Sequence, residues 1–164
     1  MKTIFKSVII AFAFLVYQSA QAQEIPKWKV EDLKAAIEKT DKPTVFNFWA
    51  TFCKPCLEEM PYFHDLVKKY EAAGVRMVLV NLDASEEYPA KIQSTAKKFK
   101  MTAPIMFLDE TDADLFCPVV DKQWSGAIPA SLFVNNKTGY RQFYEDQLSK
   151  EDLEKEIQKL ISLK

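Results

Sequence analysis

Residues 44–61 read TVFNFWATFCKPCLEEMP, and this stretch decides the fold. Its first six residues are mostly β-branched and aromatic, which predicts a strand, and a nearly continuous apolar run is typical of a central strand buried on both faces. From Cys53 onward an apolar stripe recurs at helical spacing, which predicts a helix to about residue 73 that ends at Gly74. The stripe consists of Leu57, Met60, Phe63, Val67 and Tyr70. Two cysteines therefore stand where a buried strand is followed by a helix.

The sequence Cys53-Lys54-Pro55-Cys56 has the spacing and position of a redox pair. Free backbone N–H groups and the helix dipole at a helix start favour a thiolate, and can lower a cysteine pKa from about 8.5 to roughly 3.5–7.5. Pro55 needs no hydrogen-bond partner in the first turn, and Lys54 adds an electrostatic contribution near the sulfur. A zinc site is the first alternative, but no second Cys-x-x-Cys or His pair completes four ligands. A purely structural disulfide is the second, although so short a loop constrains little of the unfolded chain.

The rest of the chain alternates helices and strands and ends in a hairpin, which predicts an α/β fold with a mixed sheet. Helices are expected at 31–39, 90–100 and, capped by Ser149, from 150 onward; residues 112–124 are expected to be helical or loop-like around Pro118. Strands are expected at 75–82, 105–108, 131–134 and 140–144, the last two joined by a turn at 136–139.

The N-terminus has the order of a cleaved secretory signal, so the domains are predicted as 1–22, signal peptide, and 23–164, folded domain. Lys2 and Lys6 precede an apolar run at 8–17, and Ala20-Gln21-Ala22 follows. An uncleaved anchor is the alternative, but a bilayer span needs roughly 20 apolar residues. Without the two lysines, 20 basic and 23 acidic side chains give a net charge of −3. We therefore expect a soluble mature protein that does not bind nucleic acid.

Residues 47–61 resemble the TlpA/ResA-like branch of the thioredoxin superfamily, which typically reads N-F-W-A-T-W-C-x-P-C-x-x-E-x-P. The resemblance continues at 78–83 and 126–129, and covers nearly all of the chain after residue 22. It implies a thioredoxin fold, with a mixed central sheet flanked by helices and the extra strand and helix of that branch. It also implies a periplasmic or otherwise extracytoplasmic thiol–disulfide oxidoreductase, often one that serves cytochrome c maturation. Such a protein needs no metal or organic cofactor, acts on protein thiols and disulfides, and takes electrons from a membrane donor.

The resemblance assigns roles to individual residues. Cys53 matches the nucleophile and Cys56 the resolving thiol, so the two form the redox disulfide. Glu59 matches the active-site glutamate, for which an ordinary exposed acid is the alternative. Pro129 matches the cis-proline that faces the cysteines, for which an ordinary trans proline is the alternative. Ile128 then offers its backbone to a bound peptide as an added strand does.

Trp49 and Phe52 complete the expected substrate-binding surface, with Phe52 standing where the family commonly has Trp. Asn47 stands where many cytoplasmic thioredoxins have a buried Asp, and an amide cannot shuttle protons, which makes Glu59 the better base.

A copper-binding or metallochaperone module on the same fold is the alternative function, because soft thiolates bind Cu(I) and His64 or Cys117 could assist. Against it, related copper proteins space their cysteines one residue wider and carry a well-placed distal His. Cys117 is instead expected to be a small buried apolar residue, with a working thiol as the alternative. His64 is expected to be a solvated helix position.

Overall fold

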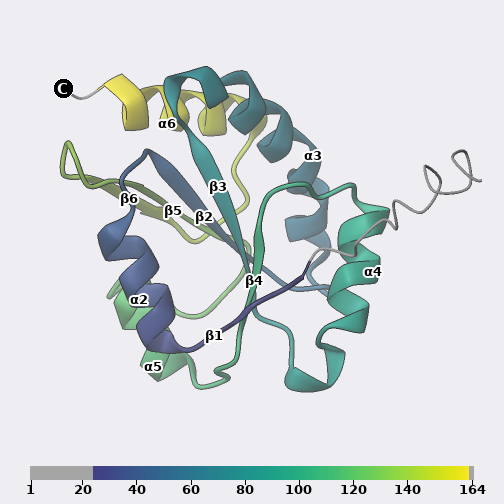
Figure 1. Ribbon diagram of the computed structural model, residues 1–164. Coiled ribbons are helices and arrows are strands. Elements are labelled where there is room, and N and C mark those ends of the chain that lie inside the picture. Colours follow the sequence, from purple (N-terminus) through teal and green to yellow (C-terminus); the bar gives the residue numbers. More distant parts are fainter. Residues whose placement is uncertain (1–23, 163–164) are drawn as a thin grey trace, which may run out of the picture.

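Six strands form one sheet in the order β1-β4-β3-β2-β5-β6 (Figure 1). The computed structural model describes residues 24–162, so the predicted signal peptide at 1–22 lies outside the described residues and stays a prediction. The strands are β1 (Lys27–Trp28), β2 (Thr44–Trp49), β3 (Arg76–Asn81), β4 (Ile105–Leu108), β5 (Ala130–Asn135) and β6 (Tyr140–Tyr144). The helices are α2 (Val30–Lys39), α3 (Lys54–Lys69), α4 (Ala90–Lys98), α5 (Ala113–Val120) and α6 (Lys150–Ser162), with short 3₁₀ turns at Glu71–Ala73 and Ser85–Glu87.

Strand β2 is the centre of the fold, and all six of its residues are buried. It pairs in parallel with β3 and antiparallel with β5, so the sheet is mixed as predicted. Side chains alternate along a strand, and here the alternation divides β2 between two cores. Val45 and Trp49 face the core under α3, α4 and α6, whereas Phe46 and Phe48 face the core under α2 and α5. This is the thioredoxin fold, with helices on both faces of the sheet.

The extra strand and helix implied by the resemblance are α4 and β4, which follow β3 in the chain. Strand β4 extends the sheet beyond β3, in parallel register with Leu79 opposite Ile105. The sequence did not reveal β1, a two-residue strand that pairs with β4. Two residues are too few to show a periodicity, and only the exposed edge of β4 makes them a strand.

Helix α3 ends earlier than predicted, at Lys69 instead of about residue 73. The chain tightens into the 3₁₀ turn Glu71–Ala73, and Gly74 then adopts the predicted left-handed conformation, with a φ of 87°. Pro61 and Pro118 lie inside α3 and α5 without ending either helix. Within residues 24–162, no helix has the length and apolar content to cross a membrane.

Candidate active site

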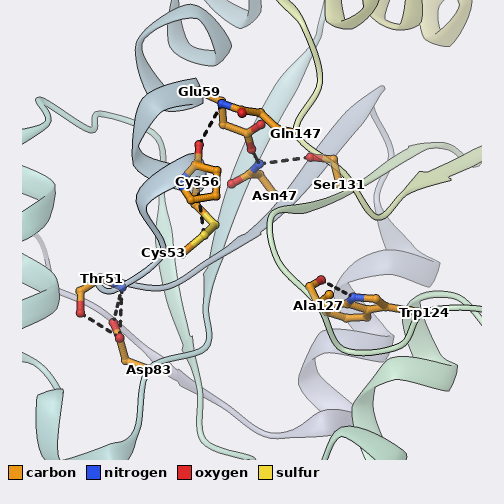
Figure 2. The surroundings of a disulfide bond; sticks show 11 residues. Asn47, Thr51, Cys53, Cys56, Glu59, Asp83, Trp124, Ala127, Ser131 and Gln147 are labelled. Carbon is orange, nitrogen blue, oxygen red and sulfur yellow. Dashed lines mark hydrogen bonds between the residues drawn. A yellow bond between two sulfur atoms is a disulfide. The ribbon is translucent and has the colours of Figure 1, made fainter.

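The two cysteines lie at the start of α3, directly after the turn that leaves β2 (Figure 2). Cys53 is the N-cap of the helix, and its Sγ accepts a hydrogen bond from the backbone N–H of Cys56 at 3.3 Å. The two sulfurs form a disulfide across a Cα–Cα distance of 5.3 Å. Cys53 keeps 6% of its surface exposed and Cys56 none. A thiolate on Cys53 would therefore be stabilised by the helix start, while Cys56 is covered.

A buried carboxylate fixes the turn that carries Cys53. Asp83, just after β3, accepts hydrogen bonds from the backbone N–H of Thr51 at 3.1 Å and from the Thr51 hydroxyl at 2.9 Å. Asn81 donates a further bond to Asp83 at 2.8 Å. Figure 2 shows Asp83 and Thr51 on the opposite side of the disulfide from Glu59. In the sequence, Asp83 stands out only as the end of the segment 78–83 that resembles the family. Its contact with Thr51 has no local signal in the sequence, because the two residues are 32 positions apart.

Glu59 is buried, with none of its surface exposed. It lies on the buried stripe of α3, and its Oε1 accepts a hydrogen bond from Nδ2 of Asn47 at 2.8 Å. Asn47 also donates to Ser131, its cross-strand neighbour on β5, at 3.1 Å. The alternative of an exposed acid is therefore excluded for Glu59, and belongs to its neighbour Glu58, whose side chain is 55% exposed.

Burial raises the pKa of Glu59 from 4.5 to about 7, while hydrogen bonds from Asn47 and the backbone of Leu148 oppose the shift. The second carboxylate oxygen, Oε2, has no hydrogen-bond partner among the described residues. A carboxyl group that is half protonated near neutral pH can both take and give a proton there. Figure 2 shows Glu59 one turn of α3 beyond Cys56.

The peptide bond between Ile128 and Pro129 is cis, as predicted. Ala130 pairs with Phe48, so this loop lies at the same end of the sheet as the disulfide. Pro129 is buried and Ile128 half-buried. Within residues 24–162, neither the backbone N–H nor the carbonyl of Ile128 makes a hydrogen bond, which leaves both able to pair with an extended peptide.

The remaining predicted contacts differ in their exposure. Phe52 is 72% exposed beside Cys53. The expectation that Trp49 contacts substrate is wrong, because the strand alternation directs it into the core, where it is fully buried. The Lys54 side chain is 87% exposed and pairs with Glu58 at 3.6 Å, so water and a carboxylate both screen its charge.

Cys117 and His64 lie apart from this site. Cys117 is a free cysteine in the core under α2 and α5, as expected, and burial raises its pKa to about 11. The expectation of a solvated His64 is wrong: the residue is half-buried, burial lowers its pKa, and its Nδ1 lies 3.4 Å from the Thr102 hydroxyl. Among the residues that the structure describes, no three His, Cys, Asp or Glu side chains group as a metal site.

A family model described as the AhpC/TSA family matches residues 16–139, more than half of the chain. The thiol–disulfide oxidoreductase ResA of Geobacillus kaustophilus is 28% identical over 139 residues, which cover 82% of this chain and 75% of that protein. The ResA of Bacillus cereus is 28% identical over 92% of this chain and 88% of its own length.

Two solved structures show the same fold. The thioredoxin-related protein from Neisseria meningitidis has a TM-score of 0.62 at 24% identity, over 88% of this chain and 92% of its own. StoA from Bacillus subtilis has a TM-score of 0.56 at 26% identity, over 73% of this chain and 85% of its own.

Proposed function

The chain belongs to the AhpC/TSA family and is a thioredoxin-fold thiol–disulfide oxidoreductase, and we propose that it reduces the disulfides of exported proteins through a cycle of Cys53 and Cys56. The observation that carries the proposal is the disulfide at the start of α3, in which Cys53 keeps 6% of its surface exposed and Cys56 none, close to a buried glutamate. The relatives named ResA support the reaction class.

The cycle starts from the dithiol. The Cys53 thiolate attacks one sulfur of a substrate disulfide and forms a mixed disulfide, and the other substrate sulfur leaves as a thiolate that takes a proton. Cys56, deprotonated, then attacks Cys53, which breaks the mixed disulfide and releases the second substrate thiol. The substrate gains two electrons and two protons, and the protein is left as the Cys53–Cys56 disulfide.

Glu59 serves as the base for Cys56 in this proposal. Its pKa of about 7 lies between those of an ordinary carboxyl and an ordinary thiol, which suits proton transfer near neutral pH. Pro129 and the free backbone of Ile128 align the substrate peptide as an added strand, and the exposed Phe52 contacts the residues around its disulfide.

The reducing direction is inferred from what surrounds the nucleophile. A strong oxidant of this kind owes its power to a highly stabilised thiolate in the reduced form. Here Pro55 donates no hydrogen bond, and the charge of Lys54 is exposed and shared with Glu58. The dithiol is therefore less stabilised, which favours electron donation to the substrate.

We place this activity outside the cytoplasm, on the strength of the predicted signal peptide at 1–22. Because that compartment oxidises thiols, a membrane protein that carries electrons from the cytoplasm is the expected donor. The family resemblance implies that such a protein often serves cytochrome c maturation. The copper-binding alternative has no support in the site, since His64 and Cys117 do not join the cysteine pair.

Equilibration of the Cys53–Cys56 pair with glutathione tests the direction. A potential near about −270 mV is expected, and one near about −120 mV would identify an oxidant instead. The substrate class is tested by a Cys56→Ser variant, which should retain the mixed disulfide on Cys53. Mass spectrometry of the trapped species should identify exported proteins with paired cysteines, and a trap that yields none would contradict the proposed substrates.

A further inference from the structure

One carboxylate holds the loop that leads into the cis-proline. Glu145, directly after β6, accepts hydrogen bonds at its Oε1 from the backbone N–H of Ser125 at 3.0 Å and of Ala127 at 3.2 Å. The hydroxyl of Ser125 donates a third, short bond to the same oxygen. Three donors from one loop therefore converge on one carboxylate oxygen, and hydrogen bonds to an ionised carboxylate are stronger than those between neutral groups.

Other contacts, made by Trp124 and Gly126, hold the same loop against the core. The indole N–H of Trp124 donates to the carbonyl of Ala127 at 2.8 Å, as Figure 2 shows, and its ring is buried against Phe48. Gly126 has a φ of 93°, and a Cβ there would come within 3.4 Å of Ala113. The loop therefore packs closely against the start of α5. The Oε1 atom of Glu145 is the acceptor for the backbone N–H groups of both Ser125 and Ala127.

The same connection between β6 and α6 also contacts α3, the helix that begins at the cysteine pair. Gln147 donates from Nε2 to the carbonyl of Pro55 at 3.2 Å. The carbonyl of Leu148 accepts a bond from the Tyr62 hydroxyl on α3 at 2.7 Å. One short segment thus joins the cis-proline loop to the helix that carries the cysteines.

We propose that Glu145 is a positioning residue for substrate binding: its carboxylate fixes the 125–127 loop, so that the backbone of Ile128 is held ready, at the end of the sheet that carries Cys53, before a peptide arrives. Ile128 follows Ala127 directly, so loss of the hydrogen bonds to Glu145 would free the residues that orient Ile128. A looser loop must be ordered when the peptide binds, and that cost weakens binding. The inference rests on the proposed docking role of Ile128.

The test compares three variants of the whole protein. Glu145→Ala removes the acceptor, Glu145→Gln keeps an acceptor oxygen without the charge, and Asp146→Ala is the control, an exposed acid on the adjacent residue. For each variant, KM and kcat are measured with a disulfide-bonded peptide, and the rate with a small aromatic disulfide that needs no strand pairing. Amide hydrogen exchange at Ser125 and Ala127 reports the loop itself.

Glu145→Ala should raise KM for the peptide about five- to tenfold, with kcat and the small-disulfide rate within about twofold of the control. Exchange at Ser125 and Ala127 should accelerate in Glu145→Ala, and Glu145→Gln should restore most of both properties. Peptide kinetics equal to those of Asp146→Ala would overturn the inference, and so would an equal loss with both substrates.

Failure of the proposed function gives a different pattern. A wild-type protein that turns over the small disulfide but shows no saturable binding of any peptide contradicts the docking role of Ile128. This result also overturns the substrate-positioning role of Glu145, even if amide exchange shows that Glu145 holds Ser125 and Ala127 in place. If the wild-type protein binds peptides and the Glu145→Ala variant has unchanged amide exchange and an unchanged KM, only the inference about Glu145 is contradicted.

Discussion

Replacing Glu59 with glutamine should remove a pH dependence from the stability of the oxidised protein. The carboxyl keeps its proton up to a pKa of about 7 in the folded state, against an ordinary value of 4.5. The folded state therefore binds the proton more tightly than the unfolded state, and the stability contributed by this group is fully present below pH 4.5. It is lost as pH rises from 4.5 through about 7. At about 1.4 kcal/mol for each pKa unit, the loss is roughly 3 kcal/mol.

Urea unfolding of the oxidised protein, measured from about pH 4 to about pH 8, checks this magnitude. The stability of Glu59→Gln relative to wild type should improve by roughly 3 kcal/mol over this range, because an amide does not ionise. Glu58→Gln is the matched control, since its exposed neighbouring carboxylate contributes less than about 1 kcal/mol. Parallel stability curves for Glu59→Gln and wild type would refute the raised pKa.

The same variant tests the proposed base. Turnover of a disulfide substrate should fall at least about tenfold in Glu59→Gln, since a positioned base typically contributes about 10²- to 10⁴-fold. Glu58→Gln should turn over normally. Equal turnover of wild type and Glu59→Gln at every pH would show that Cys56 loses its proton without Glu59.

The other cysteine predictions follow from burial. In the reduced protein, limiting iodoacetamide near neutral pH should label Cys53 first, because Cys53 keeps some exposure while Cys56 has none; peptide mapping that places the first label on Cys56 would contradict this order. Cys117 should stay unlabelled, since burial raises its pKa to about 11. Cys117→Ala should retain full turnover and lose roughly 1 kcal/mol of stability in urea unfolding; lost turnover in a folded variant would instead make it a working thiol.

Local patterns in the sequence were sufficient for the elements that build the site. The apolar run at 44–49 coincides with β2, and the two cysteines lie at the start of α3 as their spacing predicted. Both depend on neighbouring residues. The strand depends on a run of β-branched and aromatic side chains, and the position of the cysteine pair depends on the free N–H groups of a helix start. The cis-proline and the role of Glu59 came from the family resemblance, since neither a cis bond nor a base has a local signature.

Tertiary structure decided what each side chain faces. Trp49 and Phe52 were both expected to contact substrate, yet Trp49 is fully buried and Phe52 is exposed. The alternation of side chains along β2 turns Trp49 into the core, whereas Phe52 lies in the turn after the strand. Burial in the folded core raises the pKa of Glu59, and the hydrogen bond that opposes this shift comes from Asn47, twelve residues away. The cis-proline loop is held by Glu145, eighteen residues from Ala127. The sequence alone thus determined the position of the cysteine pair and of the strand before it, which are set by neighbours along the chain. Desolvation and convergent hydrogen bonds need groups that only folding brings together, so the proton affinity of Glu59 and the support of the cis-proline loop were decided by the tertiary structure.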